Sequence, residues 1–174
     1  MTVVAQRSHD GRLNQRGIAL PVVLLIVSMM LVTSAAWFEG ALFEARNAGA
    51  VIDQMQSFRA AEAGLVLCSR ALVEGAAIAP LAPAQSGEPQ GWRRQETFEA
   101  QATAPVRSWP GSVRPPQCLV EAWRIEARPA VRAFLVTARG FGATDDAQSW
   151  LQMQLVVDGM RIERHWRRVV ARPF

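Results

Sequence analysis

Few side chains in this sequence could do chemistry, and those few are far apart. The two histidines, His9 and His165, are not grouped with other metal ligands. The chain has no lysine to complete a G-x-x-x-x-G-K-S/T phosphate loop, and Gly140-x-Gly142 is too short for a dinucleotide fingerprint. No nucleophile can be grouped with a base and an orienting residue. We therefore expect a non-enzymatic protein without a metal or a cofactor.

One basic run could bind a polyanion. Arg164, Arg167 and Arg168 supply positive charge, and Trp166 supplies a ring on which a base could stack. More often such a run is the solvated edge of a sheet, where charge deters aggregation. The formal net charge of +4 also overstates the attraction for polyanions, because about half of it lies in residues 1–16. We therefore do not expect nucleic acid among the partners, and DNA binding stays an alternative.

The two cysteines, Cys68 and Cys118, could form a disulfide. Both would be exported if the basic N-terminal segment stays in the cytoplasm, and an oxidising compartment favours the bond. The closed loop of about 50 residues would stabilise the fold by about 4 kcal/mol in the chain-entropy model. Two separate buried thiols are the alternative.

A long N-terminal helix must position these residues. Residues 18–38 are uncharged, and as a helix of 21 residues they would rise about 31 Å, the thickness of a bilayer's hydrocarbon core. Residues 39–74 continue the helical pattern with one apolar face. The members of that face are spaced by three and four: Phe58, Ala61, Leu65, Cys68 and Leu72. The pattern predicts a membrane-spanning half followed by an amphipathic half that packs on a domain.

The rest of the chain predicts a small sheet. Residues 75–117 hold seven of the ten prolines, so we expect a connecting loop region, in which Trp92–Ala102 could form one strand or a short helix. Residues 118–174 contain four strand-like runs, and Asp158-Gly159 is a strong hairpin signal between the last two. The expected strands are Cys118–Ala127, Val131–Arg139, Ala147–Val157 and Met160–Val170. The predicted fold class is α+β, with the long helix packed on an antiparallel sheet.

The junction between the N-terminal segment and the apolar run resembles a known signal. Arg16-Gly17-Ile18-Ala19-Leu20 before a long apolar helix resembles the prepilin signal of type IV pilins and type II secretion pseudopilins. The resemblance implies a leader of residues 1–17, which a prepilin peptidase removes between Gly17 and Ile18 before it methylates the Ile18 amine. An ordinary secretory signal cut after Ser34-Ala35-Ala36, or an uncleaved anchor, are the alternatives.

Val22 departs from the pattern of most pilins in an informative way. In that family the fifth mature position is usually a glutamate that neutralises the terminal amine of a neighbouring subunit, and here it is Val22. An unpaired amine in an apolar filament core is costly. In the family the missing glutamate marks the minor subunits similar to PilX and the pseudopilin GspK, which sit at the tip. A chance replacement without positional meaning is the alternative.

Two further stretches resemble PilX-like minor pilins. The first is Ala60-Ala61-Glu62-Ala63-Gly64, whose small residues permit close approach of another backbone and whose Glu62 could pair with an arginine. A solvated face made of good helix formers is the other interpretation. The second stretch is Thr137-Ala138-Arg139-Gly140-Phe141-Gly142. The resemblance therefore covers both ends of the chain, while residues 75–117 are unmatched.

The resemblance implies a pilin-like minor subunit that helps to prime type IV pilus assembly and stays at or near the pilus tip. Its partners would be other minor pilins, the major pilin, the inner-membrane assembly platform and a large tip adhesin. Before assembly it would cross the inner membrane once with its C-terminal domain in the periplasm, and after assembly it would reach the cell surface. The alternatives are a tip pseudopilin of type II secretion, a DNA-uptake minor pilin, a secreted binding protein and an anchored periplasmic enzyme.

Overall fold

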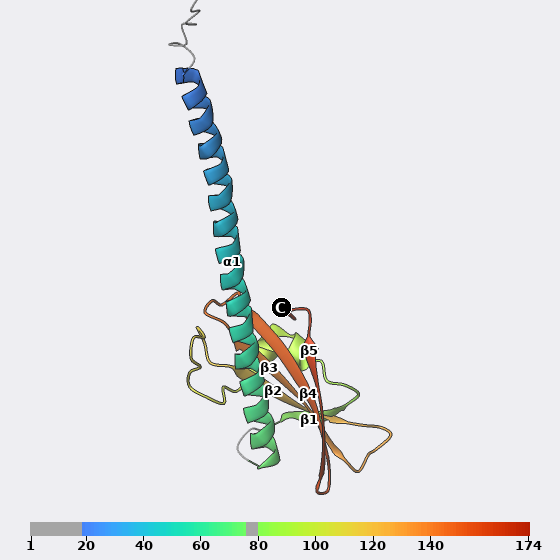
Figure 1. The fold of residues 1–174 in the computed structure, drawn as a ribbon. Helices are drawn as coiled ribbons and strands as arrows, with labels where there is room; N and C mark the ends of the chain where they lie inside the picture. Colours follow the sequence, from blue (N-terminus) through green and yellow to red (C-terminus); the bar gives the residue numbers. More distant parts are fainter. Residues whose placement is uncertain (1–18, 76–79) are drawn as a thin grey trace, which may run out of the picture. The chain divides into compact units, whose positions relative to one another are not determined.

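The computed structural model describes residues 19–75 and 80–174, in which a long helix accompanies a five-stranded sheet (Figure 1). The helices are α1 (Ala19–Val73), the 3-10 helix η2 (Gly91–Arg93) and α2 (Gln95–Gln101). The strands are β1 (Leu81–Ser86), β2 (Gln117–Arg124), β3 (Arg132–Phe141), β4 (Gln148–Asp158) and β5 (Arg161–Val169). The chain divides into two compact units between Asn47 and Ala48.

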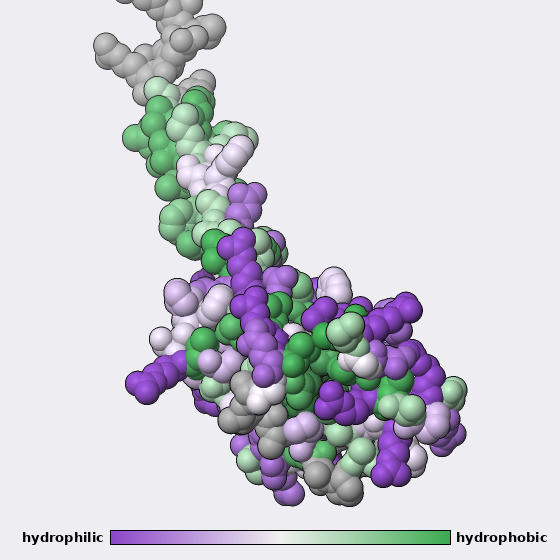
Figure 2. Space-filling view, turned by 90° about the horizontal axis from the view of Figure 1, so that it is seen from below, coloured by the Kyte–Doolittle hydropathy of each residue, from purple (hydrophilic) through white to green (hydrophobic). Residues whose placement is uncertain are grey.

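The N-terminal part of α1, residues 19–47, is exposed along its whole length. Its first charged residue is Glu39, and most of its visible surface in Figure 2 has hydrophobic colouring. The hydroxyls of Ser28 and Thr33 donate to the carbonyl oxygens of Leu25 and Met29 at 2.8 and 3.0 Å, so these side chains need no water. This end of α1 is long and apolar enough to cross a membrane.

In the second unit, the face of α1 predicted to be apolar packs on the sheet. Ala61, Leu65 and Cys68 are buried, and they form one core cluster with residues of β2, β3 and β4. The sheet residues of this cluster are Cys118, Val120, Val136, Ala138 and Leu151. The prediction of an α+β fold, with a long helix packed on an antiparallel sheet, is confirmed.

The four C-terminal strands form an antiparallel meander, β2 to β5, in sequence order. Each strand begins and ends within three residues of the range expected from the sequence. The hairpin between β4 and β5 turns at Gly159 and Met160, where Gly159 has a φ of 57° that favours glycine. The predicted turn at Asp158-Gly159 is therefore displaced by one residue along the chain.

The region between α1 and β2 contains more regular structure than the expected loop. Of the two alternatives for Trp92–Ala102, the chain adopts the helical one, as η2 and α2. An unexpected strand, β1, pairs in parallel with β2 at the edge of the sheet. Pro83 lies within β1, and the edge position tolerates it because one side of an edge strand needs no hydrogen bonds.

A second core cluster fills the sheet face opposite α1. It combines Trp92 and Phe98 from η2 and α2 with Leu119, Leu135 and Trp150 from the strands. All five are buried, and the ring of Phe174 packs edge-on against the Trp150 ring at a centroid distance of 5.2 Å. The sheet is therefore covered on both faces, by α1 on one side and by the short helices and the C-terminal segment on the other.

Candidate functional site

The expected processing site lies partly outside the described part of the chain. Gly17 and Ile18, predicted as the cleavage and methylation positions, are outside residues 19–75 and 80–174. Val22, the position of the missing glutamate, lies in α1 and is 49% exposed. Its neighbours Val23, Leu24 and Leu25 are each more than half exposed, so α1 is apolar all round at this level.

The small-residue motif of α1 contacts the protein's own sheet. Ala60, Ala61 and Gly64 are buried, and a Cβ at Gly64 would lie 3.1 Å from the Pro116 Cβ. The backbone of Ala61 lies directly against Gly140 of β3, so the small residues approach a strand of the protein's own sheet and not a second helix. Ala63 is half-buried.

Glu62 differs from the rest of the motif because it faces solvent. It is exposed, and it forms no ion pair with any residue in the described ranges. The expected pairing with an arginine of the same chain is therefore absent from the described residues. The carboxylate remains available on the outer face of α1.

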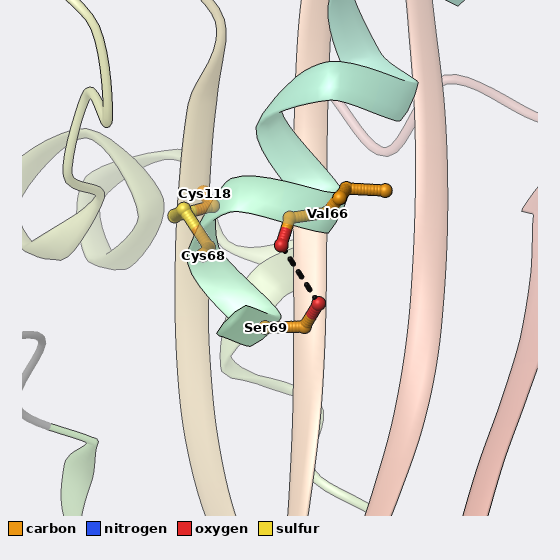
Figure 3. The surroundings of a disulfide bond; sticks show 4 residues. All are labelled: Val66, Cys68, Ser69 and Cys118. Carbon is orange, nitrogen blue, oxygen red and sulfur yellow. Dashed lines mark hydrogen bonds between the residues drawn. A yellow bond between two sulfur atoms is a disulfide. The ribbon is translucent and has the colours of Figure 1, made fainter. Parts of the chain in front are cut away.

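Cys68 and Cys118 form a disulfide that joins α1 to β2 (Figure 3). Both residues are buried in the core cluster beneath α1, and their Cα atoms are 6.6 Å apart. One residue further along α1, the Ser69 hydroxyl donates to the Val66 carbonyl oxygen at 3.0 Å, as Figure 3 shows. The sequence left open a disulfide or two separate thiols, and the structure has the disulfide.

The structure separates the four residues expected to contact a polyanion. All four lie on β5, where Arg168 is paired with Leu151, a member of the core cluster beneath α1. Since side chains alternate along a strand, Arg164, Trp166 and Arg168 are on the face of α1 and Arg167 is on the other. Arg167 forms an ion pair with Glu88, and its Nε donates to Gln152 Oε1 at 3.0 Å. Arg167 is therefore not part of the surface formed by the other three.

Three of these residues border α1 as an exposed basic surface. Trp166 is 65% exposed, and the Arg168 guanidinium lies 5.9 Å from the centroid of the Phe58 ring on α1. Arg164 lines a depression together with Val66 and Arg70 of α1. The sequence indicated these β5 residues, but it did not indicate Arg59 and Arg70 of α1, which lie beside Arg168 and Arg164.

A buried carboxylate holds the start of η2 against the sheet. Glu121 on β2 is 2% exposed, and it accepts hydrogen bonds from the N–H groups of Gly91 and Trp92 at 2.8 and 3.2 Å. Burial raises the pKa of Glu121, and the two hydrogen bonds oppose that rise. The carboxylate satisfies two N–H groups at a helix start that would otherwise lack partners.

Arg139 is a buried cation on the same face of the sheet. It is 5% exposed, and its guanidinium lies 4.5 Å from the centroid of the Phe141 ring and 5.5 Å from that of Trp150. Phe98 and Phe174 add two more rings, each 5.7 Å away. Burial lowers the pKa of Arg139, and its Nε has no hydrogen-bond acceptor among the described residues. Aromatic faces therefore supply much of the stabilisation that a carboxylate would normally give.

A polar cluster near the start of the second unit fixes the loop between β3 and β4. Asp53 of α1 accepts hydrogen bonds from the Ala143 N–H and, at 2.9 Å, from the Thr144 hydroxyl. The hydroxyls of Ser57 and Ser149 are 2.8 Å apart beneath α1. These contacts were not predicted, because the sequence does not show which loop meets Asp53.

A search of protein-family models, curated proteins and solved structures finds no match to this chain. Across residues 19–75 and 80–174, no group of three or more His, Cys, Asp or Glu side chains is placed to hold a metal ion. The features that remain are the exposed apolar N-terminal part of α1 and, within the second unit, an arginine-rich sheet edge, and both are suited to binding other macromolecules.

Proposed function

We propose that this protein is a minor pilin of the PilX-like kind, which helps to start a type IV pilus and stays at or near its tip. The observation that carries the proposal is α1, which runs without a break from Ala19 to Val73. Its uncharged N-terminal part is exposed, and the face around Ala61 and Cys68 is buried against the sheet. The N-terminal part of α1 is therefore suited to lipid, and its C-terminal part is packed on a folded domain. This is the arrangement expected of a subunit with a prepilin-like junction at Gly17.

The mechanism is helix packing in two environments. In the membrane, the exposed apolar side chains of residues 19–38 contact lipid. During assembly the same side chains exchange lipid for the apolar helices of other subunits. Val22 supplies no carboxylate to neutralise the terminal amine of a neighbour, so the subunit suits an end of the filament. Its partners would be the other minor pilins, the major pilin, the assembly platform in the inner membrane and a tip adhesin.

The mature N-terminus tests this proposal directly. The full-length chain is produced with and without a prepilin peptidase, and the purified protein is analysed by mass spectrometry. We expect a chain that begins at N-methylated Ile18 only when the peptidase is present, and no processing of a Gly17→Arg variant. A chain that begins at Trp37, or an unprocessed chain in both cases, would contradict the proposal. Counting pili and assaying secretion after gene deletion distinguishes a pilus subunit from a secretion pseudopilin.

A further inference from the structure

The outer side of β5 is an open sheet edge. β5 is the last strand in the order β1-β2-β3-β4-β5, and it pairs only with β4 over Arg161–Val169. No backbone hydrogen bond joins its other side to any residue within 19–75 or 80–174. An unpaired edge of nine residues offers a row of N–H and C=O groups to an added strand.

Two depressions lie between this edge and α1. One, of about 300 Å³, is lined by residues that include Phe58, Arg59 and Arg168. The other, of about 410 Å³, is lined by residues that include Arg70 and Arg164. Each depression thus has one arginine from the helix and one from the strand.

The arginines of this groove form no ion pairs within the described residues. None of the four arginines, Arg59, Arg70, Arg164 and Arg168, forms an ion pair with another described residue. Trp166 lies between Arg164 and Arg168 on the same face of β5, and it is 65% exposed. Charge alone would protect an edge from aggregation, but an exposed tryptophan flanked by arginines is the composition of an interface centre.

A second copy of this chain paired symmetrically about Trp166 does not suit the edge. Two β5 strands paired antiparallel about Trp166 would place Arg164 of each copy opposite Arg168 of the other, and like charges directly opposite are destabilising. The other edge of the sheet, β1, has no charged residue to neutralise them. Charge complementarity to the four arginines therefore favours an occupant from another protein that carries negative charge.

We propose that the open edge of β5 binds an extended acidic segment of a partner protein, which adds to the sheet as a sixth strand and directs its acidic side chains over the α1 face toward Arg164 and Arg168. Side chains of a strand alternate, so every second residue of the segment meets the α1 side. Carboxylates opposite Arg164 and Arg168, with an apolar residue opposite Trp166, give the pattern acid-x-apolar-x-acid. Backbone hydrogen bonds supply affinity, and the two charge pairs set the register. This surface consists of residues 54–74 and 153–168 and does not depend on the proposed pilus role.

A strand suits this edge and the arginines beside it better than a nucleic acid does. Glu74 lines the same depression as Arg164, and the exposed Glu62 lies on the same helix. A nucleic acid carries a phosphate at every nucleotide and would bring negative charge past these carboxylates. A strand can instead place neutral residues there, and it also uses the backbone groups of the open edge.

Peptide binding to the full-length protein in detergent micelles tests the proposal. The probe is the labelled, amidated peptide Thr-Glu-Thr-Val-Thr-Glu-Thr, and fluorescence anisotropy measures its affinity. We expect saturable binding with a Kd below about 1 mM, and none for the same peptide with lysine in place of glutamate. The Arg164→Glu/Arg168→Glu variant should bind the glutamate peptide at least about tenfold more weakly and should gain binding of the lysine peptide.

The control variant makes the same charge change elsewhere on the sheet. Arg124→Glu/Arg132→Glu alters two exposed arginines at the other end of the strands, and it should leave the Kd of the glutamate peptide within about twofold. No saturable binding at about 1 mM would overturn the proposal. Unchanged affinity of a peptide with proline on both sides of valine would also overturn it, because that peptide cannot pair as a strand. Tighter binding of a short oligothymidylate, lost in the Arg164→Glu/Arg168→Glu variant, would show a polyanion site instead.

Discussion

Gly140 on β3 lies directly against the backbone of Ala61 on α1, and no side chain fits between them. A Cβ at Gly140 would overlap the Ala61 amide nitrogen and the Ser57 carbonyl oxygen. The close contact brings the buried face of α1 down onto the strands, where Leu65 and Cys68 reach the core. A small residue on both elements is therefore a condition for this packing.

We expect Gly140→Ala to destabilise the domain by about 3 kcal/mol, because α1 must move away from β3. The measurement is urea unfolding of the full-length protein in detergent, followed by circular dichroism. Gly49→Ala on α1 is the matched control, since a Cβ there meets nothing within 4 Å and alanine favours the helix. Equal stability of the two variants would contradict the close packing.

Reduction of the Cys68–Cys118 bond should lower the free energy of unfolding by about 4 kcal/mol, because the bond closes a loop with a sequence separation of 50. Urea midpoints with and without dithiothreitol measure the effect. The double variant Cys68→Ser/Cys118→Ser should show the lower midpoint under both conditions. A midpoint of the unmodified protein that does not respond to dithiothreitol would argue against a stabilising bond.

The free energy of unfolding should depend on pH in part through the protonation of Glu121. Its pKa is raised in the folded state, so the folded protein holds this proton more tightly than the unfolded chain does. The contribution of Glu121 is therefore largest below the unfolded pKa and is lost as the pH rises through the folded pKa. We expect the stability difference, wild type minus Glu121→Gln, to fall across that range by at most about 1.4 kcal/mol per pH unit. A stability difference between the two proteins that stays constant with pH would refute a raised pKa of Glu121 in the folded state.

Two substitutions of Arg139 should separate the contribution of its planar guanidinium from that of its buried charge. Arg139→Lys keeps the charge but replaces a planar, weakly hydrated group by a strongly hydrated ammonium, and we expect a loss of about 2 kcal/mol. Arg139→Met removes the buried charge and fills the space among the aromatic rings, so its loss should be smaller than that of lysine. The exposed Arg132, changed in the same two ways, should show a small effect in both. A lysine variant more stable than the methionine variant would contradict this order.

The position of the missing carboxylate gives a prediction about assembly. Under the proposed function, Val22→Glu creates a subunit that can neutralise a neighbouring amine and so enter the middle of a filament. We expect several-fold fewer pili, or the variant distributed along their length, by immunogold electron microscopy. Val22→Leu should behave as the wild type. Normal pilus number with normal tip composition for Val22→Glu would count against tip placement.

The sequence predicted those parts of the fold that depend on local pattern. The apolar stripe from Phe58 to Leu72 marked the buried face of α1, and alternation with turn residues located β2 to β5. β1 was not predicted, because its parallel pairing with β2 joins distant residues and Pro83 argues against a strand. Local pattern carries no information about such a partner.

The candidate site was predicted less completely, because burial and pairing are tertiary. Alternation along β5 could have separated Arg167 from Arg164 and Arg168, once the strand was assigned. Nothing in the sequence indicated that Arg59 and Arg70 would lie beside that strand, or that Arg139 would be enclosed by aromatic rings. Those relationships follow from how α1 and the C-terminal residue Phe174 pack on the sheet.

The covalent link from α1 to β2 has a mechanical consequence. Tension applied to the N-terminal half of the helix travels along its backbone to Cys68 and then crosses a covalent bond into an interior strand. The noncovalent contacts around Ala61 could yield under load, and the bond would still hold Cys68 of α1 against β2, so the load would not pass to the main chain that follows α1. Under the proposed function, such a joint would keep the sheet seated on α1 while a filament is pulled.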